Sequence, residues 1–187
     1  MEAHDFVELC KIAPNVSIDT RYATINNFTG QAVYSSPRCF LRRAVAEKLA
    51  EIQNFLESRE LRLKVWDGYR PFSVQKKFWE LVPDERYVAN PNTTGSNHNR
   101  GAAVDVTLTD EKGIELLMPT LFDDFTVKAH RDCFDLPQEA IDNRFFLEEV
   151  MVMHGFIPYP TEWWHFDDSE CKKYPLEDIP IENLRHT

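Results

Sequence analysis

A long irregular segment, residues 82–101, interrupts the regular pattern of this 187-residue chain and limits the folds open to it. The segment is rich in Pro, Asn, Thr and Gly, which favour turns over helix or strand. It separates predicted helices and strands that alternate, a pattern that could form a parallel α/β fold. Because the chain also contains no Gly-rich phosphate-binding turn, we expect an α+β fold. That fold would be a small, mainly antiparallel sheet with helices packed on one face and the functional site on the other.

Hydrophobic periodicity predicts the individual elements. Apolar residues recur at three- and four-residue steps from Arg38 to Arg59, which predicts one long helix. Apolar and polar residues alternate over 61–65 and again over 103–109, which predicts two strands. Three further elements complete the prediction: a helix from an N-cap at Ser73 to Leu81, a helix over 141–154 and a strand over 164–166.

Size and charge restrict the class of protein. With 43% hydrophobic residues, residues 1–187 fit a single globular domain, and a net charge of −10 argues against a nucleic-acid partner. No apolar run approaches the ~18 residues of a membrane span, so membrane insertion is not expected. The acidic N-terminus shows no signal-peptide pattern, which predicts action in the cytoplasm, with export to the periplasm as the alternative. The oligomeric state stays open.

Two short stretches contain four side chains from which a hydrolytic zinc site can be built. One contains His98 and Asp105, and the other contains Glu162 and His165. Three protein ligands with one open position are typical of a catalytic zinc ion, whereas a structural zinc ion usually takes four. We therefore expect His98, Asp105 and His165 to hold one Zn²⁺ ion, and Glu162 to stay off the metal and move a proton.

The spacing within the second stretch constrains its backbone conformation. Glu162 and His165 are three residues apart, so in a regular strand their side chains would point to opposite faces. Both can address one metal ion only if the chain bends, bulges or turns at 161–163. Trp163 and Trp164 either desolvate the Glu162 carboxylate, which would raise its pKa, or belong to the core.

Other polar residues are weaker candidates. Arg70 follows a predicted strand and a Gly-Tyr turn, where it could stabilise an oxyanion, although the spacing alone favours a surface position. His154 lies at a predicted helix end, where a cation complements the helix dipole, so we expect a structural role. His130 could line the cleft. Asp123 and Asp124 form either a solvated turn or a contact to a ligand ammonium group.

Four motifs together resemble a known family. They are SxHxxGxAxD from Ser96 to Asp105, ExWH from Glu162 to His165, Tyr22–Gly30 and Trp66–Pro71. The first two resemble the zinc signatures of the peptidase family of D-alanyl-D-alanine carboxypeptidases and dipeptidases, whose fold is similar to the hedgehog signalling domain. All four together are similar to the D-Ala-D-Ala dipeptidases of the VanX type.

This resemblance implies a role for each candidate. It implies the same zinc ligands and the same base as the residue chemistry above. It also implies that Arg70 stabilises the oxyanion, with Asp67 as its support. The substrate contacts it implies are Ser96, Tyr22, Tyr34 and one acidic residue, taken here as Asp124 with Asp123 as the alternative.

The function implied by the resemblance is hydrolysis of the D-Ala-D-Ala dipeptide by a zinc enzyme. A peptidoglycan-trimming D,D- or L,D-carboxypeptidase is one alternative, and it would need an open groove for a longer peptide. A non-catalytic zinc-binding interaction domain is the other. Glu162 and Arg70 argue against that last alternative, because a structural zinc ion needs neither a base nor an oxyanion partner.

Overall fold

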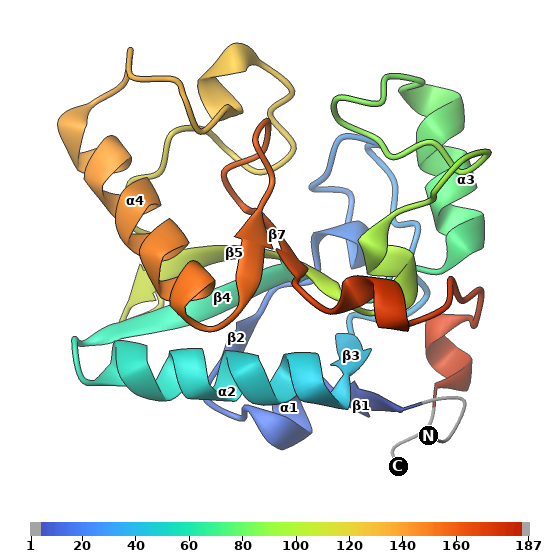
Figure 1. Cartoon of the computed structure of the whole chain (residues 1–187), viewed down its shortest axis with the longest axis horizontal. Helices are drawn as coiled ribbons and strands as arrows, with labels where there is room; N and C mark the ends of the chain where they lie inside the picture. Colours follow the sequence, from blue (N-terminus) through green and yellow to red (C-terminus); the bar gives the residue numbers. More distant parts are fainter. Residues whose placement is uncertain (1–4, 185–187) are drawn as a thin grey trace.

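A five-stranded sheet forms the centre of the protein (Figure 1). The computed structural model describes residues 5–184. Along the sheet the strands are β2 (Ser17–Ile18), β4 (Leu61–Asp67), β5 (Ala103–Asp110), β7 (His165–Asp168) and β6 (Phe156–Pro158). β2 and β4 run parallel, and every other neighbouring pair in this sheet is antiparallel. The expected α+β fold with a mainly antiparallel sheet is confirmed.

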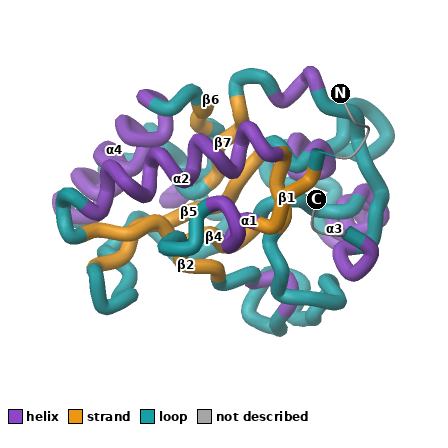
Figure 2. The backbone as a smooth tube through the Cα atoms, turned by 90° about the horizontal axis from the view of Figure 1, so that it is seen from below, coloured by secondary structure: helices purple, strands orange, loops and turns teal. Residues whose placement is uncertain are grey.

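Two long helices cover one face of this sheet. α2 (Arg43–Glu57) and α4 (Gln138–Met153) share a hydrophobic core with β4 and β5. Seen from below, α2 crosses in front of the strands (Figure 2). Side chains alternate along β5, so that Val104 and Val106 enter this core while Asp105 points to the opposite face. The site-bearing face is therefore separated from the main core by the sheet itself.

A second, mostly aromatic cluster packs beneath α3 (Phe72–Leu81). It includes Tyr22 and Tyr69 and extends to the small antiparallel sheet of β1 (Phe6–Glu8) and β3 (Phe40–Arg42). The short helix α1 (Leu9–Ile12) follows β1 directly. Within residues 5–184, five 3₁₀ helices lie outside these longer elements: Arg21–Ala23, Asn97–Arg100, Val127–Ala129, Cys171–Lys173 and Ile181–Asn183.

Several predicted boundaries shift. The helix predicted from Arg38 begins only at Arg43, because residues 40–42 pair with β1 as strand β3. α3 begins at Phe72 after the N-cap Pro71, and α4 begins three residues earlier than 141, after the N-cap Pro137. The final strand runs over 165–168, and its partner β6 was not predicted.

The predicted bend before His165 is confirmed. Residues 159–164 form a turn-rich loop between β6 and β7. The backbone N–H of His165 donates to the carbonyl of Glu162 at 3.3 Å, which folds the chain back on itself. The two side chains can therefore face one site despite their three-residue spacing.

Across residues 5–184, the helices are all too short or too polar to cross a bilayer. Action in the cytoplasm and a single domain over 1–187 stay predictions.

Candidate metal centre and active site

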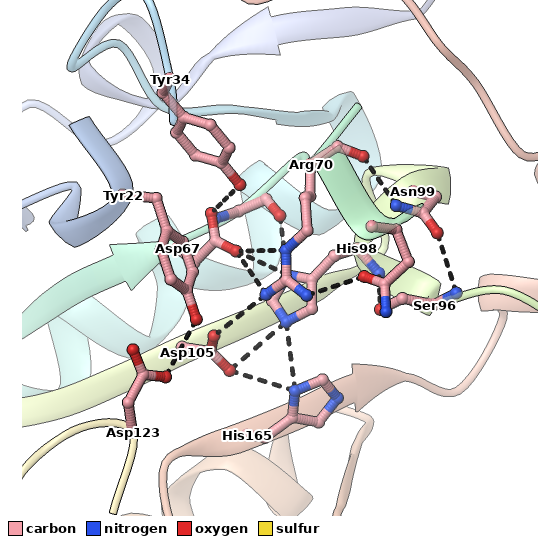
Figure 3. Close-up of polar contacts among 12 residues, drawn as sticks. Tyr22, Tyr34, Asp67, Arg70, Ser96, His98, Asn99, Asp105, Asp123 and His165 are labelled. Carbon is pink, nitrogen blue, oxygen red and sulfur yellow. Dashed lines mark hydrogen bonds and ion pairs between the residues drawn. The ribbon is translucent and has the colours of Figure 1, made fainter. Parts of the chain in front are cut away.

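His98, Asp105 and His165 bring one ligand atom each to a common point (Figure 3). Nε2 of His98 lies 3.1 Å from Nδ1 of His165 and 3.4 Å from Oδ1 of Asp105, and the last two atoms are 3.1 Å apart. Ligands bound tetrahedrally to zinc at ~2.0–2.1 Å lie roughly 3.3–3.4 Å from one another. The three separations therefore fit one zinc ion with a fourth position left for water or substrate.

The sheet and a short helix deliver these three ligands. Asp105 on β5 lies directly opposite His165 on β7 in the antiparallel register. His98 belongs to the 3₁₀ helix 97–100, which is capped by Ser96, whose Oγ accepts the backbone N–H of His98 at 3.2 Å. Two ligands thus sit on rigid strands, and the third sits on a capped helical turn.

Gly101 lets the loop that carries His98 return to the sheet. It ends the 3₁₀ helix in the left-handed conformation, with φ of 68°. A Cβ at this position would lie 2.3 Å from Cε1 of Phe6. Both the backbone conformation and the space therefore require glycine here.

Each imidazole is oriented by a hydrogen bond from its other nitrogen. Nδ1 of His98 donates to the carbonyl of Gly68 at 2.7 Å, which leaves Nε2 for the metal. Nε2 of His165 lies 3.0 Å from Oδ1 of Asp167, which leaves Nδ1 for the metal. Outer partners of this kind fix the tautomer and raise the basicity of a metal-bound histidine.

Arg70 is buried beside the metal position, so the surface position favoured by its spacing is wrong. Asp67 Oδ2 accepts Nε at 3.1 Å and Nη2 at 2.7 Å, and Gln75 Oε1 accepts Nη1 at 2.9 Å. Tyr34 in turn donates to Asp67 Oδ1 at 2.8 Å. Nη2 lies 3.8 Å from Oδ2 of Asp105, which places the guanidinium next to the metal ligands.

Glu162 is a buried carboxylate at the same place, with 8% of its surface exposed. Its Oε2 lies 3.8 Å from Nδ1 of His165. Burial raises the pKa of Glu162 to about 8, while the nearby His165 lowers it. A divalent cation bound alongside would lower this pKa further toward neutrality. Both Trp163 and Trp164 are fully buried and belong to the core.

Asp123, rather than Asp124, reaches the active-site cavity. Its carboxylate accepts the Tyr22 hydroxyl at 2.9 Å and the backbone N–H of Phe28 at 3.2 Å, and burial raises its pKa to about 7. The backbone of Asp123 is left-handed, with φ of 62°, which turns the next side chain away. Asp124 accepts the backbone N–H of Thr126 instead, so its choice as the ammonium contact is corrected.

The cavity that these groups line has a volume of about 260 Å³. Pockets that bind drug-sized ligands are usually ~300–1,000 Å³, so this one suits a smaller molecule. The predicted site residues on its wall are Tyr22, Arg70, Ser96, His98, Asp105, Glu162 and His165. Tyr34 lies behind Asp67, outside the lining, so a direct substrate contact by Tyr34 is not supported.

The two weaker histidine candidates lie elsewhere. His130 is absent from the cavity lining in the described chain, so it does not line the cleft. His154 forms the C-cap of α4, and its Nδ1 donates to the carbonyl of Val150 at 2.7 Å. The expected structural role of His154 agrees with this position.

Comparison with known proteins decides the family. A family model described as D-ala-D-ala dipeptidase, within the M15 peptidases, matches residues 2–179. The chain belongs to this D-Ala-D-Ala dipeptidase family. It is 37% identical over 172 residues to the D-alanyl-D-alanine dipeptidase of Escherichia coli (strain K12), covering 92% of this chain and 89% of that relative. It is 33% identical over 181 residues to the D-alanyl-D-alanine dipeptidase of Enterococcus faecalis, covering 86% of this chain and 90% of the relative.

A solved structure supports the fold of this D-Ala-D-Ala dipeptidase family member. The LdcB LD-carboxypeptidase is similar with a TM-score of 0.51 and 18% identity, over 100% of this chain and 81% of that chain. At this identity the likeness concerns the α+β architecture alone.

Two residues of the site were missed from the sequence. Asp167 orients His165 and is two residues away on the same strand, a spacing that places both on one face and could have identified it. Gln75 lies one helical turn into α3, and its contact with Arg70 has no sequence signal. Asp167 also lines the cavity of this D-Ala-D-Ala dipeptidase family member, whereas Gln75 lies behind Arg70, outside the lining of the described chain.

Proposed function

We propose that this chain is a zinc-dependent dipeptidase that hydrolyses D-alanyl-D-alanine. The observation that carries the proposal is the convergence of three candidate ligand atoms within 3.4 Å of one another beside the buried carboxylate of Glu162. A structural zinc site would not need that carboxylate or the clamped guanidinium of Arg70.

His98, Asp105 and His165 would hold the zinc ion. When bound, zinc supplies a Lewis acid that polarises the scissile carbonyl and makes water a better nucleophile. Glu162 takes the proton from the attacking water and delivers it to the departing amine. Its raised pKa suits this exchange, because a base works best when its pKa is near the working pH.

Arg70 stabilises the negative charge that develops on the carbonyl oxygen. Its contacts with Asp67 and Gln75 use three N–H groups and hold the guanidinium plane in place. The remaining N–H groups of Nη1 and Nη2 are free to donate to the oxyanion. Because the group is already oriented, little reorganisation is needed when the charge forms.

The wall of the cavity that carries Asp123 favours a short substrate. Asp123 lies on the wall, held by Tyr22 and Phe28, where it can accept the free ammonium group of a dipeptide. An acylated amine carries no charge, and the rest of a longer peptide would have to pass this wall. This favours the free dipeptide over a peptidoglycan stem peptide.

Replacement of Glu162 tests the mechanism. We expect Glu162→Ala to lower kcat for D-Ala-D-Ala by ~10²–10⁴-fold while one zinc ion per chain is retained. Glu149→Ala, on the exposed side of α4, is the matched control and should leave both values unchanged. Full activity in Glu162→Ala would refute the assigned role.

A substrate panel tests the specificity. We expect the zinc-loaded protein to cleave D-Ala-D-Ala, and to cleave L-Ala-L-Ala and N-acetyl-D-Ala-D-Ala far more slowly. Cleavage of a muramyl pentapeptide without cleavage of the free dipeptide would overturn the proposal in favour of a carboxypeptidase.

A further inference from the structure

The cavity is lined by more acidic than basic side chains, although a dipeptide carries one charge of each sign. Five carboxylates lie on the wall: Glu85, Asp105, Asp123, Glu162 and Asp167. Apart from the two metal-binding histidines, the lining residues of the described chain include two cationic side chains, Arg70 and Lys172. A dipeptide with a free carboxylate brings a further negative charge into this cavity, and these two are the cationic side chains that could compensate it.

Arg70 is poorly placed to receive a carboxylate. Asp67 binds it through two hydrogen bonds and compensates its charge, and Asp105 lies 3.8 Å from Nη2. Nη2 is thus close to the metal ligands, where the reacting carbonyl would lie. A second anion at this position would compete with the oxyanion for the same donors.

Lys172 differs from Arg70 both in its position and in the charge of the group that it contacts. It belongs to the 3₁₀ helix Cys171–Lys173 and is solvent-exposed at the edge of the cavity. Its Nζ donates to Oδ1 of Asn97 at 3.1 Å, and Asn97 is a neutral amide. An ammonium group has three N–H donors, so this contact leaves donors and the full positive charge for a ligand.

The neighbourhood of Lys172 can complete a carboxylate site. Asn97 is adjacent to Ser96, whose side chain also lines the cavity, and Asp123 comes from a different segment, the loop before the 3₁₀ helix 127–129. A zwitterion could therefore place its two charged ends against residues from separate parts of the wall.

We propose that Lys172 binds the C-terminal carboxylate of the dipeptide and so makes the enzyme select substrates with a free acid. This inference rests on the proposed dipeptidase function. A different role is open to the same side chain, because Asn97 also hydrogen-bonds Asp167, the partner of His165. In that case Lys172 would support the metal site and would not recognise the substrate. If Lys172 recognises the substrate, its removal changes the preference for a free acid. If it supports the metal site, its removal changes zinc binding.

The experiment compares D-Ala-D-Ala with D-Ala-D-Ala amide, which lacks the carboxylate. Lys172→Met keeps the aliphatic stem and removes the charge. We expect kcat/KM for the free acid to fall at least about ten-fold, mainly through KM, because a hydrogen bond to a charged group is lost. Hydrolysis of the amide should change little, so the preference of the enzyme for the acid should largely disappear.

Lys173→Met is the matched control. Lys173 is the next residue, also exposed, but it pairs with Glu170 and is absent from the cavity lining of the described chain. We expect it to keep the acid-to-amide preference of the unsubstituted enzyme. The proposal is overturned if Lys172→Met also keeps that preference, or if it slows both substrates equally and weakens zinc binding.

A binding measurement separates this inference from the proposed function. Calorimetric titration of D-Ala-D-Ala into zinc-loaded Glu162→Ala reports affinity without turnover. Adding Lys172→Met to that variant should weaken the binding about ten-fold or more. Unchanged affinity would refute the role of Lys172 even if the enzyme hydrolyses the dipeptide, whereas failure of the unsubstituted enzyme to hydrolyse it would refute the proposed function.

Discussion

Asp167 lies 3.0 Å from Nε2 of His165, and this contact decides which nitrogen of the imidazole faces the metal position. The two residues are on the same face of β7, two positions apart. His98 instead presents Nε2 to the metal position, because its Nδ1 donates a hydrogen bond to a backbone carbonyl. The metal site thus depends on contacts that do not touch the metal.

Removal of the Asp167 carboxylate should weaken zinc binding. We expect Asp167→Ala to lower zinc affinity by ~10–100-fold, because His165 loses the partner that fixes its tautomer and orientation. Competition with a chromogenic chelator measures this affinity. Asp142→Ala, on the exposed side of α4, is the control. Equal affinities for the two variants would contradict the assigned role of Asp167.

Gln75 should affect catalysis through Arg70. Its Oε1 accepts Arg70 Nη1 at 2.9 Å, while its Nε2 donates to the carbonyl of Ala89 at 2.8 Å, on the cavity wall. We expect Gln75→Leu to lower kcat roughly ten-fold, with little change in KM or zinc content, because the guanidinium loses one of its anchors. In an Arg70→Ala background the same substitution should have almost no further effect. Additive losses would show that Gln75 acts independently of Arg70.

The Asp123 carboxylate should cost the protein stability at neutral pH. Its pKa rises from 3.8 to about 7 on folding, so the folded state holds its proton more tightly. The stability contributed by this proton is present below pH 3.8 and is lost as the pH rises through about 7. Asp123→Asn should therefore raise the free energy of unfolding at pH 8, by up to about 4 kcal/mol.

Asparagine is the suitable replacement, because it tolerates the left-handed backbone of Asp123. Its Oδ1 can accept the backbone N–H of Phe28, and its Nδ2 can donate to the hydroxyl oxygen of Tyr22. Urea denaturation at pH 4 and pH 8 measures the effect, which should be much smaller at the lower pH. The variant should also lose affinity for D-Ala-D-Ala. A variant that is less stable at pH 8 would contradict the raised pKa.

Alanine substitution at two glycines distinguishes the energetic cost of backbone strain from the cost of steric crowding. Gly101 and Gly113 are both left-handed, with φ of 68° and 82°, but only at Gly101 would a Cβ meet another atom, in the ring of Phe6. Alanine at Gly113 should cost roughly 1–2 kcal/mol from backbone conformation alone. Alanine at Gly101 should cost about 1–3 kcal/mol more, because Phe6 must move. Chemical denaturation of the metal-free protein measures both, and equal losses would contradict the contact.

Local rules predicted two features of the candidate site. Alternation along 103–109 placed Asp105 on the polar face, and the spacing of Glu162 and His165 required the turn that the structure contains. Both predictions depend on the periodicity of a strand, which is a property of a short segment.

Contacts between distant segments could not be predicted in this way. The helical pattern from Arg38 continues through Phe40, but pairing with β1 makes that residue part of a strand. Arg70 is buried because Asp67 and Gln75 both bind it. The choice between two adjacent aspartates depends on one left-handed residue, Asp123, and the sequence carries no periodic signal for it.

The separation of the metal ligands from the main core bears on how the enzyme matures. The ligands lie on the face of the sheet opposite α2 and α4, and both imidazoles are oriented by protein groups alone. In zinc fingers the free energy of metal binding drives folding, but this fold has its own core and does not need that contribution. We therefore expect metal loading to be a late and reversible step. The availability of zinc would then set the fraction of active molecules without changing the amount of folded protein.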